Sequence, residues 1–416
     1  MKTQIKLIAI ALCLVAATSN AQWTNMDAGI SGNLVYAMDT LHGELYVGGY
    51  FTMAGKTGTT INCASWNGAA WSVNCSFAIS ENIYALITFN GNLYAGYYGG
   101  IAEWNGTSWS KIGGGGGNAT TGTVYALAVY NGNLYVGGEF TSMYGTSSTN
   151  NIAEWNGSSW VALGTGVTGG TGIVKSLAVL NGNLYAGGNF TTAGGNTVSD
   201  IAEWNGTSWS ALTTGTNGTV NAMAVYNGEL FVGGSFSTAG GLSVTNLATW
   251  NGSTWSAPSG IGTNAVSALT VSNGNLYVGG EYIYEWNGTA STTLGDFGTG
   301  LEEVDAMAVY NNNLYAGGGF TTINSAAGFS NIAEYTAPTS INEVQNSSHF
   351  AAYPNPFSES FNLDLPKVAD VKVYDELGQM VFHSTMQQGH NQVNIEGAKG
   401  FYLLSVNDVF QKLIKE

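Results

Sequence analysis

One phrase recurs along this chain with little change. The segment VYALAVYNGNLYVGGEF begins at Val124, and nearly the same letters return at Val174 as VKSLAVLNGNLYAGGNF. Its central leucine recurs at positions 45, 93, 134, 184, 230, 276 and 314, at intervals of 48, 41, 50, 46, 46 and 38 residues. Sequence periods of this length are typical of solenoids and propellers. The chain therefore builds one small unit several times over.

The turn residues within each copy predict strands. In the copy that begins at Val124, an apolar segment leads through an Asn-Gly pair into a second segment that ends in Gly-Gly. A third segment covers residues 151–155, and another Asn-Gly pair precedes a fourth segment that opens at Trp160. Asn-Gly between alternating segments is a strong hairpin signal, because both residues tolerate positive φ. Four antiparallel strands in each of seven repeats predict an all-β fold, a seven-bladed β-propeller.

The two ends of the repeat region complement each other. The last copy reaches Asn331–Tyr335 and has no fourth strand, whereas Trp23–Ile30 matches the fourth-strand segment Trp160–Val167 in its tryptophan, apolar and glycine positions. Unpaired sheet edges are a liability that folded proteins avoid. We therefore predict that the N-terminal strand completes the last blade and closes a ring of seven.

Composition limits the partners. The chain has 60 glycines and 12% aromatic residues, which favours short strands and tight turns over helices. Its formal net charge is −16, and none of its ten basic residues is an arginine. Nucleic acids and anionic membrane surfaces are bound by clustered Lys and Arg. We therefore expect neither as a partner.

The first 21 residues predict a secretory signal peptide. Lys2 and Lys6 precede an apolar run over residues 7–17, and small residues follow at the cleavage position. The run is too short to span a bilayer, and we expect no transmembrane segment elsewhere. The mature chain keeps two cysteines, Cys63 and Cys75. In an oxidising compartment we expect these two to form a disulfide bond.

The repeats resemble the kelch and galactose-oxidase type of propeller. The shared features are the Gly-Gly pair that ends the second strand and the tryptophan that opens the fourth, as in Gly137, Gly138 and Trp160. The blades are also similar to those of fungal cortical polarity-marker proteins. The resemblance covers about residues 22–335 and implies the fold, since propellers serve many unrelated functions.

A second domain follows a linker at residues 336–344. Residues 345–416 contain YPNPF at 353–357, VKVYDELGQMVF at 371–382, GFYLLSV at 400–406 and a terminal QKLIKE. Alternating strands and turns predict a small β-sandwich. These phrases resemble the type A C-terminal sorting domain of the type IX secretion system. That resemblance implies the secretion machinery and its sortase as partners. It also implies a product that is released or anchored on the outer surface of a Gram-negative bacterium.

Most residues that carry chemistry have a structural explanation. A glutamate precedes the aromatic residue of the third strand in five repeats, at Glu103, Glu154, Glu203, Glu285 and Glu334. Paired carboxylates can act as general acid and base. However, one carboxylate at the same position in each blade favours a structural hydrogen bond. The repeated Trp-x₄-Trp pairs likewise favour packing between blades over sugar binding.

Several known sites are excluded by missing residues. The propeller region contains a single histidine, His42, and no arginine, so neither a galactose-oxidase copper site nor a sialidase carboxylate site can form. Calcium loops of the Asp-x-Asp kind, Cys-x-x-Cys pairs and Gly-x-Ser-x-Gly nucleophile elbows are also absent from the sequence. We expect no metal and no cofactor.

One position of the innermost strand differs between repeats. It follows the β-branched residue that opens the strand, and in blade order it is Tyr36, Tyr84, Tyr125, Lys175, Asn221, Ser267 and Asp305. Tyrosines offer flat apolar faces with a polar tip, and the other side chains supply hydrogen bonds. We predict a ligand site formed by these residues at the channel mouth. Simple drift at a solvated rim would also produce such variation.

These observations predict a secreted, non-catalytic surface propeller that binds a glycan or a protein through its variable loops. Loops that vary around a uniform scaffold are where recognition residues gather. Two alternatives remain open. The first is a glycan-cleaving enzyme that uses the acidic run Glu302, Glu303 and Asp305. The second is a structural component of a surface layer.

Overall fold

The computed structural model describes residues 22–56, 58–77, 81–113, 122–262, 264–298, 303–337, 351–375, 379–396, 399–407 and 409–415. The predicted signal peptide, residues 338–344 of the predicted linker, and Glu302 lie outside these ranges. Two compact units are present, Gln22–Ala337 and the remainder of the chain. All regular structure in the described residues is β-strand, as the all-β prediction requires.

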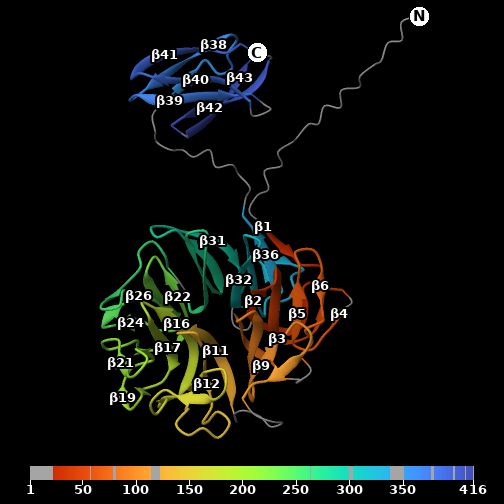
Figure 1. The fold of residues 1–416 in the computed structure, drawn as a ribbon, viewed down its shortest axis with the longest axis vertical. Helices are drawn as coiled ribbons and strands as arrows, with labels where there is room; N and C mark the ends of the chain where they lie inside the picture. Colours follow the sequence, from red (N-terminus) through yellow and green to blue (C-terminus); the bar gives the residue numbers. More distant parts are fainter. Residues whose placement is uncertain are drawn as a thin grey trace, which may run out of the picture. The chain divides into compact units, whose positions relative to one another are not determined.

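The first unit is a set of antiparallel sheets arranged around a common centre (Figure 1). Each main sheet orders its strands from the centre outward as first, second, third and fourth. The first strands are β2 (Ile30–Leu41), β7 (Ile83–Phe89), β11 (Thr123–Tyr130), β16 (Ile173–Leu180), β22 (Val220–Tyr226), β28 (Val266–Ser272) and β32 (Val304–Tyr310). The second strands are β3 (Glu44–Ala54), β8 (Asn92–Tyr97), β12 (Asn133–Glu139), β17 (Asn183–Asn189), β23 (Glu229–Gly234), β29 (Asn275–Gly280) and β33 (Asn313–Gly318).

The outer strands complete these sheets. The third strands are β5 (Cys63–Trp66), β9 (Gly100–Trp104), β13 (Ile152–Trp155), β20 (Ile201–Trp204), β26 (Leu247–Trp250), β30 (Tyr282–Trp286) and β36 (Ile332–Thr336). The fourth strands are β6 (Trp71–Ser72), β10 (Trp109–Lys111), β14 (Trp160–Ala162), β21 (Trp209–Ala211), β27 (Trp255–Ser256), β31 (Ser291–Asp296) and β1 (Gln22–Asn25). Short loop strands are β4 (Gly58–Thr59), β15 (Val167–Thr168), β18 (Thr192–Ala193), β19 (Asn196–Thr197), β24 (Thr238–Ala239), β25 (Leu242–Ser243), β34 (Thr322–Ile323) and β35 (Ala326–Ala327).

The inner hairpins form at the predicted Asn-Gly pairs. Between β11 and β12, Tyr130 pairs with Asn133, and the two loop residues Asn131 and Gly132 have φ angles of 49° and 79°. Two positive φ angles in a two-residue loop match the twist of the flanking strands. The outer Asn-Gly pairs differ from this prediction. There Asn105 keeps a negative φ, and its side-chain oxygen accepts hydrogen bonds from the backbone N–H groups of Thr107 and Ser108.

Adjacent sheets approach closely because the second strand ends in glycine. A Cβ atom added to Gly187 of β17 would lie 2.5 Å from Cγ1 of Val220, which opens β22 in the next sheet. The same contact recurs around the unit: Gly48 with Ile83, Gly96 with Val124, Gly137 with Val174, Gly233 with Val266 and Gly317 with Val35. Gly279 differs, because its added Cβ would lie nearest to Met307 at 3.0 Å and 3.3 Å from Val304. The Gly-Gly pair of the repeat therefore makes room for a β-branched side chain of the neighbouring sheet.

The tryptophans of the fourth strands join adjacent sheets. The indole N–H of Trp209 donates to the carbonyl of Leu163, which follows β14 of the preceding sheet, at 2.9 Å. Trp255 donates to Leu212 and Trp109 to Cys75 in the same way. A buried indole N–H needs such a partner. This contact supports the structural interpretation of the repeated tryptophans.

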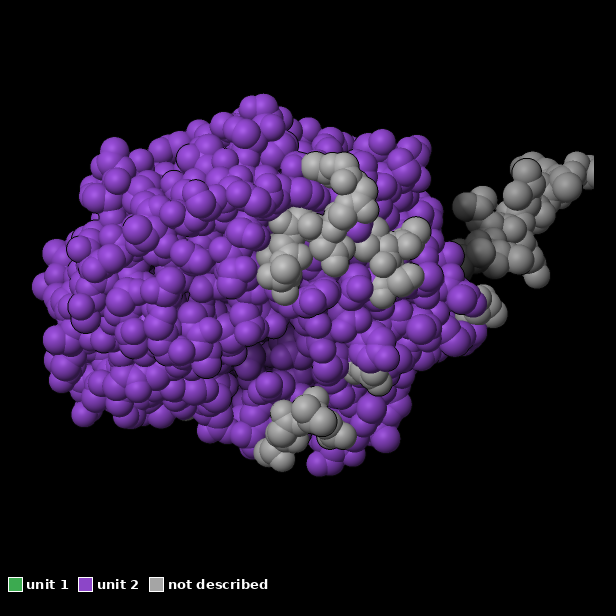
Figure 2. Space-filling model, turned by 90° about the horizontal axis from the view of Figure 1, so that it is seen from below, with its two compact units in different colours: residues 1–21, 338–416 green, residues 22–337 purple. Residues whose placement is uncertain are grey.

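The first strand of the described chain lies in the last sheet. β1 pairs antiparallel with β36, with Trp23 opposite Tyr335. The Trp23 indole N–H donates to the carbonyl of Leu294 in the preceding sheet, and the carbonyl of Met26 accepts from Trp71 in the next. Residues 22–26 therefore make the contacts that a fourth strand makes elsewhere. In the space-filling view, residues 22–337 form one continuous body (Figure 2).

The C-terminal unit consists of two sheets over one core. The first contains β37 (Ala351–Tyr353), β38 (Ser360–Leu365) and β41 (Gly389–Asn394). The second contains β40 (Met380–Met386), β39 (Ala369–Tyr374), β42 (Gly400–Val406) and β43 (Val409–Lys415). Phe361 and Leu363 of the first sheet and Val371, Val373 and Leu404 of the second are fully buried in one cluster. Two sheets that share a core are a β-sandwich.

The Gly–Val contact predicts which glycines tolerate a methyl group. We expect Gly187→Ala to destabilise the first unit by about 1–3 kcal/mol, because the added Cβ overlaps Val220. If the ring is closed, Gly317→Ala should cost as much, since its neighbour Val35 belongs to the first repeat. Chemical denaturation measures both. Gly262→Ala is the control, because nothing lies within 4 Å of its added Cβ. A stable Gly317→Ala variant beside an unstable Gly187→Ala variant would contradict closure.

Candidate functional site

The predicted site residues share one backbone feature, a β-bulge. In β11 the register with β12 shifts between Val124 and Ala126, which leaves Tyr125 without a cross-strand partner. The six other candidate residues, Tyr36, Tyr84, Lys175, Asn221, Ser267 and Asp305, occupy the same unpaired place in their strands. A bulge turns a side chain out of the regular alternation of the strand. This position is therefore free of cross-strand packing, which explains why it can differ between repeats.

The three tyrosines form a continuous aromatic group. The rings of Tyr36 and Tyr84 are stacked, with centroids 5.0 Å apart and planes at 28°. The ring of Tyr84 then meets Tyr125 edge-on at 5.3 Å. Their strands β2, β7 and β11 are neighbours around the centre of the unit. The bulges thus place three half-buried phenol rings side by side.

The polar candidates are linked to one another on the next strands. Lys175 donates from Nζ to Oδ1 of Asn221 at 3.1 Å, and the Asn221 amide donates to the carbonyl of Val266 at 3.1 Å. The neighbouring Ser267 hydroxyl lies 3.4 Å from Oε2 of Glu303. Lys175 is exposed, whereas Asn221 and Ser267 are half-buried. This side of the group offers a cation, an amide and a hydroxyl.

Asp305 completes the series as its one acidic residue, and its pKa is raised. Burial, and then the negative charge of Glu303, raise the pKa of Asp305 from 3.8 to about 7. Burial also raises the pKa of Glu303. The pKa of Tyr36 rises to about 12, chiefly through burial, with Tyr84 and Asp305 as the next causes. Asp305 therefore lies near Tyr36, and the candidate residues form one ring of neighbours, which we call the bulge ring.

Sequence reasoning missed a second variable position beside the bulge ring. The residue after each Gly-Gly or Gly-Tyr pair of the second strand also differs between repeats, and it includes Tyr50, Tyr98 and Glu139. Thr123, two residues before Tyr125, pairs with Glu139 in β12, and the side chains of Tyr50 and Tyr98 are each 45% exposed. This second position could have been found in the sequence by the same criterion, its divergence from repeat to repeat.

The five repeated glutamates belong to a different network. Glu103 accepts hydrogen bonds from the Asn92 amide at 2.6 Å and from the Tyr94 hydroxyl at 3.0 Å. The amides of Asn133, Asn183, Asn275 and Asn313 make the same bond to Glu154, Glu203, Glu285 and Glu334. Two repeats replace both partners together, with Glu44 and Ser65 in one and Glu229 and Thr249 in the other. Such paired replacement favours the structural interpretation.

The two cysteines are joined by a disulfide bond. Their Cα atoms are 5.6 Å apart and both residues are fully buried. Cys63 opens β5, as expected of the outer hairpin. Cys75 lies beyond the end of β6, which stops at Ser72. The bridge therefore ties the loop after β6 back to the third strand. In the described part of the chain, no three His, Cys, Asp or Glu side chains lie close enough to hold a metal ion.

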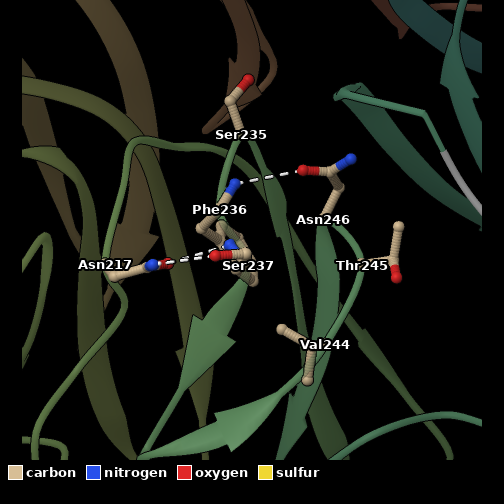
Figure 3. Close-up of a pocket in the computed structure, with 7 residues that line it drawn as sticks. All are labelled: Asn217, Ser235, Phe236, Ser237, Val244, Thr245 and Asn246. Atoms are coloured by element: carbon tan, nitrogen blue, oxygen red, sulfur yellow. Dashed lines mark hydrogen bonds between the residues drawn. The ribbon is translucent and has the colours of Figure 1, made fainter.

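A hollow of about 440 Å³ lies in the loops after β23 and β25. Figure 3 shows Asn217, Ser235, Phe236, Ser237, Val244, Thr245 and Asn246 around it. Asn217 accepts hydrogen bonds from the backbone of Ser237 and Thr238, and Asn246 accepts one from Phe236. These side chains hold the loops together, and none of them belongs to the bulge ring.

The C-terminal unit matches a known family. Residues 351–416 match the family described as the secretion system C-terminal sorting domain. The protein is therefore secreted or attached to the cell surface through the type IX system, and the tail implies contact with that machinery. No helix in the described residues has the length and apolar character needed to cross a membrane.

Solved structures similar to this chain include β-propellers. PorZ, an essential surface component of the type IX secretion system of Porphyromonas gingivalis, is 16% identical with a TM-score of 0.49, covering 93% of this chain. The WD40 propeller of Doa1 is 12% identical over 76% of this chain and 98% of its own, with a TM-score of 0.48. Virginiamycin B lyase from Staphylococcus aureus is 11% identical over 76% of this chain and 99% of its own, with a TM-score of 0.48.

These likenesses carry no functional argument. The matched region spans 60% of the PorZ chain. No curated protein matches the sequence. What this protein can bind or catalyse therefore depends on the residues of its own chain.

The raised pKa of Asp305 predicts a pH-dependent stability. The folded state holds the proton of Asp305 more tightly than the unfolded state does. The protonated carboxyl group therefore adds fully to the free energy of unfolding below about pH 4, and this contribution is lost as pH rises to about 7. Across that window we expect wild-type protein to lose stability relative to Asp305→Asn, by at most about 4 kcal/mol at 1.4 kcal/mol per pKa unit. Denaturation at a series of pH values measures it. Glu303→Gln should move the window to lower pH, and parallel curves for wild type and Asp305→Asn would refute the raised pKa.

Proposed function

We propose that this protein is a non-catalytic surface propeller that binds a glycan or a protein at the bulge ring. The observation that supports this proposal is the coincidence of sequence divergence with a bulge. The two positions that flank the bulge are nearly constant, with Val or Ile before it and Ala or Ser after it, whereas the bulge ring changes from tyrosine to lysine, amide, hydroxyl and carboxylate. Backbone regularity with varied side chains at one place is what a recognition site requires.

We further propose that the repeat region is a seven-bladed propeller closed by its N-terminal strand, of the kelch and galactose-oxidase type. Three observations support closure. β1 pairs with β36, Trp71 donates to the carbonyl of Met26, and Gly317 packs against Val35. The innermost strands also contact one another in sequence, from β2 to β32 and from β32 to β2. Each innermost strand remains the edge of its own sheet, and ring closure leaves only short edges that neighbouring strands protect at the centre.

A glycan-cleaving activity is the second candidate. It is favoured by Asp305 and Glu303, two neighbouring carboxyl groups whose pKa values are both raised by burial. A carboxyl group with a pKa near 7 can donate a proton at neutral pH, as the acid of a glycosidase does. Incubation with a panel of polysaccharides separates the two functions. Retention without release of reducing ends supports binding, and release that is lost in Asp305→Asn supports cleavage.

The proposal predicts that binding depends on the bulge ring. We expect the combined variant Tyr84→Ala, Tyr125→Ala and Lys175→Ala to lose ligand retention and to stay folded. Each aromatic pair contributes about 1 kcal/mol beyond burial, and Lys175 is exposed, so the fold should persist. The assay is retention on the glycan panel beside a melting curve.

The control for this variant lies on the same strands. Val129→Ala and Val179→Ala remove exposed side chains from β11 and β16 beyond the bulges, and both side chains are 36% exposed. This pair should bind like wild type. Full retention by the folded triple variant would place the site elsewhere.

The sorting tail predicts a separate dependence of export. Without residues 345–416 the propeller should fold but remain in the periplasm, because the tail is matched by a sorting family and forms its own compact unit. Fractionation followed by protease accessibility of whole cells measures this. Surface display of the truncated chain would contradict the assignment.

A further inference from the structure

A second hollow adjoins the aromatic side of the bulge ring. It has a volume of about 510 Å³ and lies between the first and last sheets of the repeat region. Its lining residues are Ile30, Ser31, Gly32, Leu34, Tyr50, Gly319, Thr321, Ser330 and Asn331. Pockets for small ligands have volumes of about 300–1,000 Å³. The hollow is therefore large enough to take part of a ligand.

Tyr50 connects this hollow with the bulge ring. It lines the hollow, and its side chain is 45% exposed. It is also close enough to Tyr36 to contribute to the raised pKa of that ring residue. Tyr50 pairs with Leu34 in the register of β2 and β3, two residues before Tyr36, so it follows the aromatic group of Tyr125, Tyr84 and Tyr36 along the first sheet. The hollow of Figure 3 has no such aromatic residue at the equivalent place, because Ser235 takes the position that Tyr50 has in the first repeat. The amides of Asn217 and Asn246 there bind the loop backbone.

The charges around this path disfavour an anionic ligand. Asp305 belongs to the bulge ring and Glu303 lies beside it, and Glu139 adds to the causes that raise the pKa of Tyr125. The nearby cation Lys175 is hydrogen-bonded to Asn221. The hollow itself is lined by aliphatic, aromatic, hydroxyl and amide groups without a charged side chain among them. A cationic chain would find carboxylates at the ring but none in the hollow.

From this arrangement we infer that the ligand is a neutral oligosaccharide that starts at the bulge ring and runs over Tyr50 into the hollow between the first and last sheets. Sugar rings present apolar faces that stack on tyrosine, while their hydroxyls pair with the serine, threonine and asparagine groups. In this inference a disaccharide contacts the bulge ring alone and longer chains reach Tyr50 and the hollow, so affinity rises with chain length until the hollow is filled. The inference rests on the proposed function of the ring.

The test uses the mature chain on immobilised oligosaccharides of two to six units. The panel contains neutral gluco-, manno-, xylo- and galacto-series, a galacturonic acid series and a glucosamine series, with a lysine-rich peptide beside them. Wild type should bind a neutral series with affinity that increases with length. Tyr50→Ala should lose about tenfold for the longer members, the effect of about 1.4 kcal/mol of lost aromatic contact, and nothing for the disaccharide.

Two variants control the result. Tyr98→Ala removes a tyrosine of equal exposure from the equivalent place in the next repeat, away from the hollow, and should keep the length dependence. Tyr50→Phe keeps the aromatic face that stacks on a sugar and should also keep the dependence of affinity on chain length. Unchanged length dependence in Tyr50→Ala, or preference for the uronic acid series or the peptide, overturns the inference and leaves the ring site intact. Absence of binding by wild type overturns the proposed function as well.

Discussion

The close approach of neighbouring sheets is the constraint on which this structure depends. The first glycine of each Gly-Gly pair faces the β-branched residue that opens the next innermost strand, and a Cβ on Gly187 would lie 2.5 Å from Val220. Close packing of this kind fixes the spacing of two sheets to within a methyl group. The tryptophans of five fourth strands, Trp23, Trp71, Trp109, Trp209 and Trp255, hydrogen-bond to the preceding sheet near its outer end, as Trp209 does to Leu163. Sheets joined in this way are therefore held to their neighbour at both their inner and outer ends.

The same constraint produces the site. Val124 must point toward Gly96 of the preceding sheet, whereas the following Ala126 resumes the register with Gly137. The bulge between them leaves Tyr125 without a cross-strand partner, and its ring instead meets Tyr84 of the neighbouring strand. Because every innermost strand is built in this way, the fold presents one side chain per strand that has no cross-strand partner. In the proposed function, scaffold and recognition are thus separated by a single residue of the repeat.

Burial at the centre also changes the chemistry of the acids. Asp305 has one charged neighbour of its own sign, Glu303, and little solvent, so its pKa approaches neutrality. The repeated Glu103 position behaves differently, since Asn92 and Tyr94 donate hydrogen bonds to its carboxylate. Both places carry a carboxyl group, the group that general acid-base chemistry uses. The difference between them is the supply of donors, and sequence spacing does not report it.

The sequence by itself determined the strands, the inner hairpins and the order of the repeats. Asn-Gly pairs, Gly-Gly pairs and the period of about 45 residues depend on local backbone chemistry, which is written in consecutive letters. It also indicated the bulge residues as divergent, and the sorting tail through its phrases. Only the tertiary structure decided which side chains meet. The stacking of Tyr36 on Tyr84, the proximity of Asp305 to Tyr36, and the hollow beside Tyr50 join residues tens to hundreds of positions apart. Those contacts depend on how the sheets pack around the centre, and no local pattern records that packing.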